Sequence, residues 1–314
     1  MTSFAFVFPG QGSQSVGMLD AWGDHPAVTA TLAEASEALG QDIGRLIHEG
    51  PEATLALTVN TQLVMLVAGV ANYRAWLAEG GPVPAAVAGH SLGEYSALVA
   101  AGALTLADAV PLVRFRAQAM QDAVPVGTGV MMAILGLDGA EVRRGCEQAA
   151  RDSGEVVSAA NYNDPKQTVI AGSRAGVDMA VELLKHMGAK RAMPLSVSAP
   201  FHCALMKPAA ERLKERLAST PLVAPAIPLV NNIDVAVETE PERIRDALYR
   251  QAFGPVRWVE VVEALRARGL SRIYECGPGR VLAKMIKRIE HAQAVSTTVL
   301  DPTSLAEAKG MLAS

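Results

Sequence analysis

The feature that most constrains the fold is a serine between two glycines, at the junction of a predicted buried strand and a predicted helix. Residues 89–93 read Gly-His-Ser-Leu-Gly; the apolar residues 83–89 predict the strand, and residues 92–101 predict the helix. A strand that passes directly into a helix is typical of α/β folds. Small residues on both sides of the serine permit a tight turn that exposes its hydroxyl group. We therefore expect an α/β fold with Ser91 as a candidate nucleophile on this turn.

The five-residue pattern is weak by itself, because about one chain in ten with this glycine content contains it by chance. The strand before it and the helix after it strengthen the interpretation. The alternative is that Ser91 is an ordinary N-cap residue of the helix, a position at which serine is favoured.

Apolar periodicity divides the rest of the large region into further strands and helices. A strand is expected over 4–8, and helices over 29–40, 60–79 and 106–122. After residue 199 we expect helices over 207–219, 241–252, 256–268 and 279–290, and strands near 227–231, 271–275 and 295–299. Together these elements predict one α/β domain made of residues 1–125 and 199–314.

Residues 126–198 predict a separate small lobe. Strands are expected over 130–135, 156–161, 168–171 and 191–197, with helices over 139–151 and 174–187, so the order is βαββαβ. This order is typical of a ferredoxin-like α+β arrangement. The predicted fold class is therefore α/β: a large α/β-hydrolase-like domain with an inserted ferredoxin-like lobe.

A serine nucleophile needs donors for the oxyanion that forms when it attacks a carbonyl group. The backbone N–H of Leu92 lies at the predicted start of a helix and points toward such a site. A second donor has to come from another loop, and Gln11, in Gly10-Gln11-Gly12 after the first strand, is the best candidate. A dinucleotide-binding fingerprint is rejected here because the next glycine is Gly17, which does not fit the spacing.

The nucleophile also needs a general base, and histidine is the usual one. Among six histidines, His90 adjoins the serine and is expected to be structural, since neighbours on such a turn point apart. His202 follows the last strand of the small lobe, where the chain re-enters the large domain and can overhang a cleft. We expect His202 to be the base.

Composition limits the partners of this 314-residue chain. Lys plus Arg number 28 and Asp plus Glu 32, so no global basic field favours nucleic acid as a ligand. The longest apolar stretch, 63–71, is half the length needed to span a membrane, and the first ten residues do not resemble a signal peptide. Cys146, Cys203 and Cys276 show no metal-ligand spacing and fit a reducing compartment. We expect a cytoplasmic protein without a metal.

Five runs, in this order along nearly the whole chain, strongly resemble the malonyl-CoA:acyl-carrier-protein transacylases of type II fatty acid synthesis. They are Phe-Pro-Gly-Gln-Gly-Ser-Gln at 8–14, Gly-His-Ser-Leu-Gly-Glu-Tyr-Ser at 89–96, Asn-Tyr-Asn at 161–163, Pro-Phe-His at 200–202 and Tyr-Glu-Cys-Gly-Pro-Gly at 274–279. Acyltransferase domains of polyketide synthases are close relatives of this family.

The resemblance implies a role for each matching residue. Ser91 would attack the malonyl thioester, His202 would accept its proton, and the N–H groups of Gln11 and Leu92 would bind the oxyanion. The family pairs its histidine with a main-chain carbonyl near a glutamine, and Gln251 matches that position. Without an ion pair, we expect the pKa of His202 to stay near its unperturbed value.

The resemblance also implies residues that select the substrate. Arg116 matches the arginine that binds the free malonyl carboxylate, and a guanidinium suits this task because it can meet a carboxylate with two parallel hydrogen bonds. Arg114 lies two positions away on the same predicted helix, so only one of the two can serve. Asn161 and Met120 are assigned to the substrate site as well. Phe201, where some relatives carry serine, favours malonyl over methylmalonyl, because the ring crowds an α-methyl group.

The implied reaction is a ping-pong transfer of malonyl from coenzyme A to Ser91 and then to the phosphopantetheine thiol of acyl carrier protein. No cofactor is implied, and a monomer is expected. Since acyl carrier proteins are acidic and this chain is net negative, docking needs a local basic face. The candidates lie on one predicted helix and at the end of the small lobe: Arg280, Lys284, Lys287, Arg288, Lys190 and Arg191.

Three other classes compete with this interpretation. A serine thioester hydrolase would share Ser91 and His202, but the run at 8–14 and Arg116 argue against it. A trans-acting polyketide synthase acyltransferase, or one with a different extender unit, stays open. A binding protein without activity would be expected to lose Ser91 or His202, and both are present.

Overall fold

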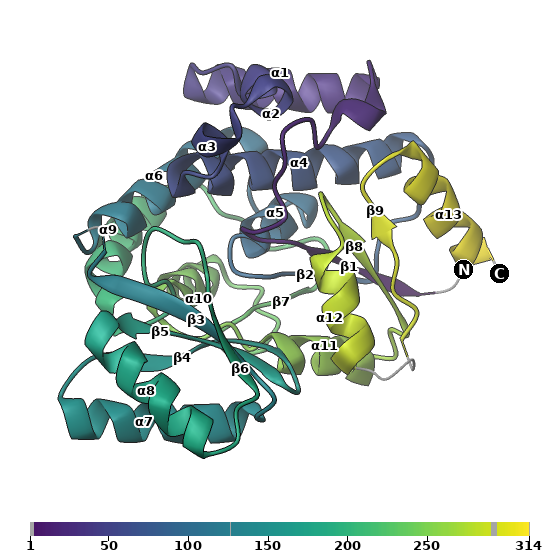
Figure 1. Ribbon diagram of the computed structural model, residues 1–314. Coiled ribbons are helices and arrows are strands. Elements are labelled where there is room, and N and C mark those ends of the chain that lie inside the picture. The colour runs from purple at the N-terminus through teal and green to yellow at the C-terminus, as the bar shows by residue number, and fades with distance from the viewer. Residues whose placement is uncertain (1–2, 126, 290–293, 314) are drawn as a thin grey trace.

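Two β-sheets organise the chain, and the computed structural model describes residues 3–125, 127–289 and 294–313 (Figure 1). The larger sheet has five strands in the order β7-β2-β1-β8-β9, and each neighbouring pair is parallel. Its strands are β1 (Phe4–Phe8), β2 (Ala86–Gly89), β7 (Leu229–Val230), β8 (Arg272–Cys276) and β9 (Thr298–Val299).

Both faces of the larger sheet are buried. Side chains alternate between the two faces of a strand, so the residues of β1 divide between two clusters. On β1, Phe4, Phe6 and Phe8 pack into one hydrophobic cluster, while Ala5 and Val7 belong to another. The phenylalanine face is covered by α4 (Thr58–Ala78), α5 (Gly93–Ala100) and α6 (Leu106–Asp122), and the other face by α11 (Trp258–Ala267) and α12 (Val281–Ile289). Further helices outside these layers are α1 (Pro26–Leu39), α2 (Ile43–Glu49), α3 (Glu52–Leu55), α9 (Lys207–Ala218), α10 (Pro241–Phe253) and α13 (Pro302–Ala313).

The smaller sheet is antiparallel, with the strand order β4-β5-β3-β6. Its strands are β3 (Gly129–Leu135), β4 (Val157–Asp164), β5 (Gln167–Ser173) and β6 (Arg191–Pro194). The helices α7 (Gly139–Ser153) and α8 (Arg174–His186) pack together against it and share a third hydrophobic cluster (Figure 1). The chain order of these elements is βαββαβ, as the sequence predicts.

β4 joins the small lobe to the segment between α10 and α11 of the large region. The N–H of Tyr162 donates to the Val256 carbonyl at 2.9 Å, and the N–H of Val256 donates to the Ala160 carbonyl at 2.8 Å. This junction places the inner end of the small lobe over the carboxyl ends of β1 and β2, the edge where parallel sheets bind ligands. The predicted mixed α/β class is confirmed, with one parallel and one antiparallel sheet.

Several predicted bounds are wrong, and proline explains two of them. The strand expected over 83–89 begins at Ala86, because Pro82 and Pro84 cannot donate ladder hydrogen bonds. The strand near 227–231 shrinks to β7 after Pro228 for the same reason. The strand over 191–197 ends at Pro194, and that over 295–299 keeps only Thr298 and Val299.

The helices α2, α3 and α13 were not predicted, and 290, the last residue of the helix expected over 279–290, lies outside the described residues. Among the helices that the structure describes, none has both the length and the apolar character to cross a bilayer.

Candidate active site

A cavity of about 110 Å³ lies where the small lobe faces the ends of β1 and β2. Its lining includes eight predicted site residues: Gln11, Ser91, Leu92, Arg116, Met120, Asn161, Phe201 and His202. It also includes Gln62, His90, Met131, Leu195 and Val197, which were not predicted to contact substrate. Residues far apart in the sequence therefore converge on one small volume.

Ser91 sits on a strained turn between β2 and α5, which we call the elbow (residues 89–93). Its φ angle is 52°, in the left-handed region that side chains other than glycine rarely adopt. A Cβ atom on Gly89 would lie 1.9 Å from the carbonyl carbon of Gly93, and one on Gly93 would lie 2.0 Å from the Phe8 carbonyl oxygen. Glycine is therefore required at both positions, because any side chain would collide with the neighbouring backbone. The N-cap alternative is wrong, because Leu92 occupies that position and no side chain caps α5.

The hydroxyl group of Ser91 faces His202. The Oγ atom lies 2.7 Å from Nε2 of His202, and Nδ1 of the same ring lies 2.9 Å from the Gln251 carbonyl oxygen and 3.2 Å from that of Gly254. Carbonyl oxygens only accept hydrogen bonds, so Nδ1 carries the proton and Nε2 is free to accept one from Ser91. This geometry suits a neutral histidine acting as a general base.

The expectation that His202 keeps an unperturbed pKa is wrong. Burial, and then the positive charge of Arg116, lower the pKa of His202 to about 3, and the two carbonyl acceptors offset only part of this shift. The ring is 4% exposed, so an imidazolium ion would lose most of its hydration. The sequence does not reveal this burial, because it comes from the junction of distant segments.

Arg116 is a buried cation beside Ser91. Its guanidinium donates to Oε1 of Gln62 at 2.5 Å, to Oε1 of Gln251 at 3.1 Å and to Oγ of Ser91 at 3.3 Å. It lies over the ring of Tyr95, 5.3 Å from the centroid, and its Nε atom has no hydrogen-bond partner among the described residues. Burial lowers the pKa of Arg116 from its ordinary value.

Arg114 points elsewhere, as the helical spacing predicts. It donates to Asn60 at 3.2 Å and to Gln41 at 2.7 Å, and it does not line the cavity. Only Arg116 is therefore placed to meet an anionic group near Ser91.

Two backbone N–H groups are available beside the nucleophile. Gln11 and Leu92 both line the cavity, and within the described part of the chain neither N–H has a hydrogen-bond acceptor. The loop after β1 approaches the elbow closely, since a Cβ atom on Gly10 would lie 2.6 Å from the His90 carbonyl oxygen. His90 is held by Asn163, with Nε2 2.9 Å from Oδ1, which agrees with a structural role.

Sequence reasoning missed three buried polar residues that contact the elbow, Gln251 or Arg116. Gln62 binds Arg116, and Asn232 and Glu94 contact the elbow or Gln251. One signal was present: Asn231 and Asn232 directly follow β7, which is the parallel neighbour of β2. Residues at the carboxyl ends of adjacent parallel strands lie close together.

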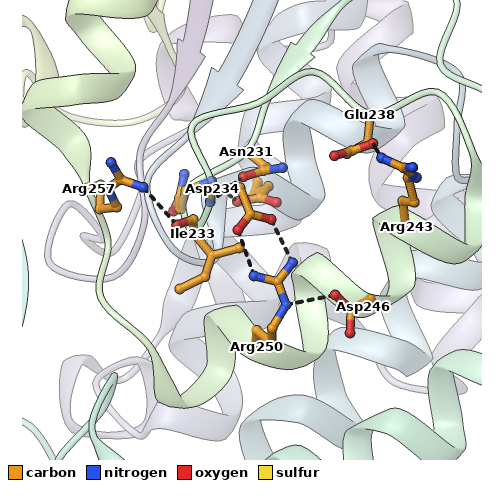
Figure 2. A network of polar contacts seen from close by, with 10 residues as sticks. Asn231, Ile233, Asp234, Glu238, Arg243, Asp246, Arg250 and Arg257 are labelled. Atoms are coloured by element: carbon orange, nitrogen blue, oxygen red, sulfur yellow. Dashed lines mark hydrogen bonds and ion pairs between the residues drawn. The ribbon is translucent and has the colours of Figure 1, made fainter.

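A second polar network fixes the turn that carries Asn232 (Figure 2). Arg250, on α10, donates to Asp234 at 2.7 and 2.6 Å and to Asp246 at 2.7 Å. The N–H of Asp234 donates to Oδ1 of Asn231 at 2.8 Å. In this turn Val235 has a φ angle of 57°. Among the described residues other than glycine, positive φ angles occur at Ser91, His202 (60°) and Val235.

The predicted docking residues are exposed, but they do not all gather in one place. Lys190 and Arg288 line one groove of about 470 Å³, together with Lys166 and Asp164. Arg288 is held there by an ion pair, with Nε 2.5 Å from Oδ2 of Asp164. The remaining four are exposed outside this groove lining: Arg191, Arg280, Lys284 and Lys287. No group of three or more His, Cys, Asp or Glu side chains among the described residues is arranged to hold a metal ion.

Comparison with known proteins gives consistent matches over the whole chain. The profile of the acyl transferase domain family matches residues 5–312. The malonyl CoA-acyl carrier protein transacylase of Escherichia coli strain K12 is 52% identical over 309 residues, which cover 98% of this chain and 99% of that protein. The corresponding protein of Bacillus subtilis strain 168 is 44% identical over 97% of this chain and 96% of its own length.

Solved structures with a closely similar fold match nearly the whole chain. An acyl-carrier-protein S-malonyltransferase from Burkholderia pseudomallei 1710b superposes with a TM-score of 0.96 at 59% identity, covering 98% of this chain and all of that one. A malonyl-transacylase in complex with a type II polyketide synthase acyl-carrier protein superposes with a TM-score of 0.95 at 47% identity, covering 99% of this chain and 100% of that one.

Proposed function

This chain belongs to the acyl transferase domain family and is an acyltransferase, and we propose that it transfers malonyl from malonyl-CoA to the phosphopantetheine thiol of acyl carrier protein. The observation that carries the proposal is the buried guanidinium of Arg116, 3.3 Å from Oγ of Ser91. A malonyl thioester has a free carboxylate two carbons from the carbonyl that Ser91 attacks. Arg116 can therefore bind the carboxylate while Ser91 reacts with the thioester.

The reaction proceeds in two balanced halves. Oγ of Ser91 attacks the thioester carbonyl while Nε2 of His202 takes its proton; the C–S bond then breaks, and His202 returns the proton to the sulfur of coenzyme A. In the second half, the phosphopantetheine thiol gives its proton to His202 and attacks the malonyl ester. The C–O bond to Ser91 breaks, and the serine oxygen recovers the proton.

The lowered pKa keeps His202 neutral, and it also makes Nε2 a weaker base than an ordinary imidazole. A neutral ring at Nε2 is ready to accept a proton at any pH above about 4. The N–H groups of Gln11 and Leu92 would bind the oxyanion in each half-reaction, and Gln251 would hold the ring through its carbonyl oxygen. Because transfer between a thioester and a serine ester needs only these groups, we propose that no cofactor takes part.

The pocket favours a small substrate with a charged end. Phe201 is buried at 8% exposure and lines the cavity beside Met120 and Asn161, which supports malonyl over a branched acyl group by an amount worth about 1–3 kcal/mol. The pathway is proposed to be fatty acid synthesis. A trans-acting polyketide synthase acyltransferase is the second candidate, since one similar structure is a complex with a polyketide carrier protein.

The carrier protein is proposed to dock where the small lobe meets α12. The groove lined by Lys190, Arg288 and Lys166 supplies positive charge, and exposed Lys284 and Lys287 extend it along α12. The ion pair to Asp164 reduces the charge that Arg288 offers. Arg191 and Arg280 are assigned to the same face.

We propose two domains: residues 1–125 with 199–314 as an α/β-hydrolase-like domain, and residues 126–198 as a ferredoxin-like lobe. The parallel sheet that carries a serine elbow supports the first, and the strand order of the antiparallel sheet supports the second. The protein is proposed to act as a cytoplasmic monomer. Its three cysteines are free and buried, which suits a reducing compartment.

The proposal is tested by incubating the protein with malonyl-CoA carrying a radioactive malonyl group. We expect label on the parent protein, transfer of that label to holo acyl carrier protein, and no label on Ser91→Ala. Labelling of Ser91→Ala equal to that of the parent would exclude the proposed nucleophile. Label released as free malonate at the rate at which it reaches the carrier would favour a hydrolase instead.

A further inference from the structure

Three fully buried polar residues outside the cavity lining join the elbow to the segment that supports the base. They are Glu94 on α5, Asn232 after β7 and Gln251 on α10, with exposed fractions of 2%, 0% and 0%. Buried polar groups without partners are costly, and these three satisfy one another.

Asn232 closes the strained elbow from outside. Its Oδ1 atom accepts from the N–H of Ser91 at 2.7 Å, and its Nδ2 atom donates to the carbonyl of Gly89 at 2.6 Å. The side chain thus binds the backbone on both sides of His90. These two bonds stabilise the left-handed backbone of Ser91, which otherwise costs about 1–3 kcal/mol.

Gln251 performs a second task on the base side. Its carbonyl oxygen accepts from Nδ1 of His202, while its side-chain Nε2 donates to the Ser91 carbonyl at 3.0 Å. Its Oε1 atom accepts from Arg116 at 3.1 Å. Movement of Gln251 therefore displaces the base and the carboxylate-binding cation together.

One carboxylate oxygen connects these two residues. Oε2 of Glu94 accepts from the backbone N–H of Asn232 at 2.9 Å and from Nε2 of Gln251 at 3.0 Å. We propose that Glu94 is a positioning residue for acyl transfer: by binding Asn232 and Gln251 through one oxygen, it holds the Ser91 backbone and the His202 ring in mutual register. This inference rests on the proposed function of the site.

The contacts indicate that Glu94 acts through hydrogen bonds more than through charge. Burial raises the pKa of Glu94 to about 7, and the charged groups that act on it are Arg116 from α6 and Asp234 from the turn after β7. Both donors meet the same oxygen, so a neutral acid or an amide that presents an oxygen there can accept both bonds. Glu94→Gln should therefore preserve the positioning function of this residue, and Glu94→Ala should not.

The turn that carries Asn232 is held independently on its other side. Arg250 binds Asp234 and Asp246, as Figure 2 shows, and the Asn232 carbonyl accepts from the N–H of Arg257 at 3.2 Å. Loss of Glu94 should thus loosen the inner contacts without unfolding the turn.

The test compares Glu94→Ala and Glu94→Gln in single-turnover acylation of the protein by malonyl-CoA, with melting temperature as a check of folding. Glu275→Gln is the matched control, since Glu275 is also fully buried and accepts the N–H of Ala283 at 2.8 Å, but among the described residues it has no hydrogen bond or ion pair with a site residue. We expect Glu94→Ala to lower the maximal acylation rate about 100-fold, with half-saturation within about fivefold, because a misplacement of about 1 Å costs this much. Glu94→Gln should stay within about fivefold of the parent, and Glu275→Gln should match it.

Two results would overturn the inference: an unchanged acylation rate in folded Glu94→Ala, or equal losses in Glu94→Ala and Glu94→Gln. If Glu94→Ala does not fold, Asn232→Ala decides, since it removes the bond to the Ser91 N–H and should slow acylation to a similar extent; a parent-like rate there also refutes the inference. Failure of the parent protein to become acylated at Ser91 would refute the proposed function instead, whatever the Glu94 variants do.

Discussion

Acylation of Ser91 by malonyl-CoA should be nearly independent of pH between 8 and 5. The proposed base, His202, has Nε2 2.7 Å from Oγ of Ser91 and must be neutral to accept its proton. Burial and the charge of Arg116 lower the pKa of His202 to about 3. A histidine with an ordinary pKa of about 6.5 would be only about 3% neutral at pH 5, whereas one with a pKa near 3 would be about 99% neutral.

These fractions give two clearly separated expectations. An ordinary histidine predicts a fall of about 30-fold in the acylation rate from pH 8 to pH 5, and the structure predicts less than about twofold. The assay is rapid mixing of protein with saturating malonyl-CoA, acid quenching, and measurement of the acyl-enzyme by intact mass. A single turnover excludes carrier docking and product release from the measured rate.

Glu94 complicates this profile, because burial raises its pKa to about 7. The same series is therefore recorded for Glu94→Gln, which cannot titrate at that position. A fall of about 30-fold with a midpoint near pH 6.5 in this variant would refute the argument that burial and Arg116 keep His202 neutral.

Two further predictions concern buried charges. Arg116→Met should lower the ratio of malonyl to acetyl acylation by about 10²- to 10⁴-fold, since two charge-assisted hydrogen bonds of about 1.5–3 kcal/mol each are lost; an unchanged ratio in parallel assays with both thioesters would show that another group binds the carboxylate. Burial raises the pKa of Glu275 to about 7, so this carboxyl group favours folding below its unfolded pKa of about 4.5 and loses that contribution as the pH rises through 7. At pH 8, Glu275→Gln should therefore increase the free energy of unfolding by up to about 3 kcal/mol and raise the melting temperature above that of the parent. At pH 5 the two proteins should melt at the same temperature. The same rise in melting temperature at both pH values would contradict this.

The pairing of Ser91 with His202 could be predicted because the signals for both residues are local. Ser91 lies between two glycines after an apolar strand, and His202 follows the last strand of the small lobe. Both patterns depend on neighbours within a few positions. The choice of Arg116 and its role came from the family resemblance, whereas helical spacing predicted only that Arg114 and Arg116 point to different faces.

The supporting residues were missed because their partners are distant in the sequence. Asn232 contacts Ser91 across 141 positions, and Gln251 contacts Glu94 across 157. The periodic pattern of apolar residues along the sequence does not reveal contacts between positions this far apart. The depressed pKa of His202 was missed for the same reason, since it depends on how two lobes bury the ring. By contrast, α13 could have been found, because Asp301 and Pro302 form an N-cap and first-turn pair at its start.

The positive φ angles at Ser91, His202 and Val235 imply that activity and folding respond differently to mild denaturation. All non-glycine residues in this conformation among those described are Ser91, His202 or part of the turn that carries Asn232. Backbone strain persists only while the surrounding contacts hold it, so loosening of those contacts should release these residues before the sheets and helices unfold. As temperature or denaturant rises, the enzyme should lose transfer activity while its secondary structure is still intact, so the temperature at which it stops working will lie below the one at which it melts.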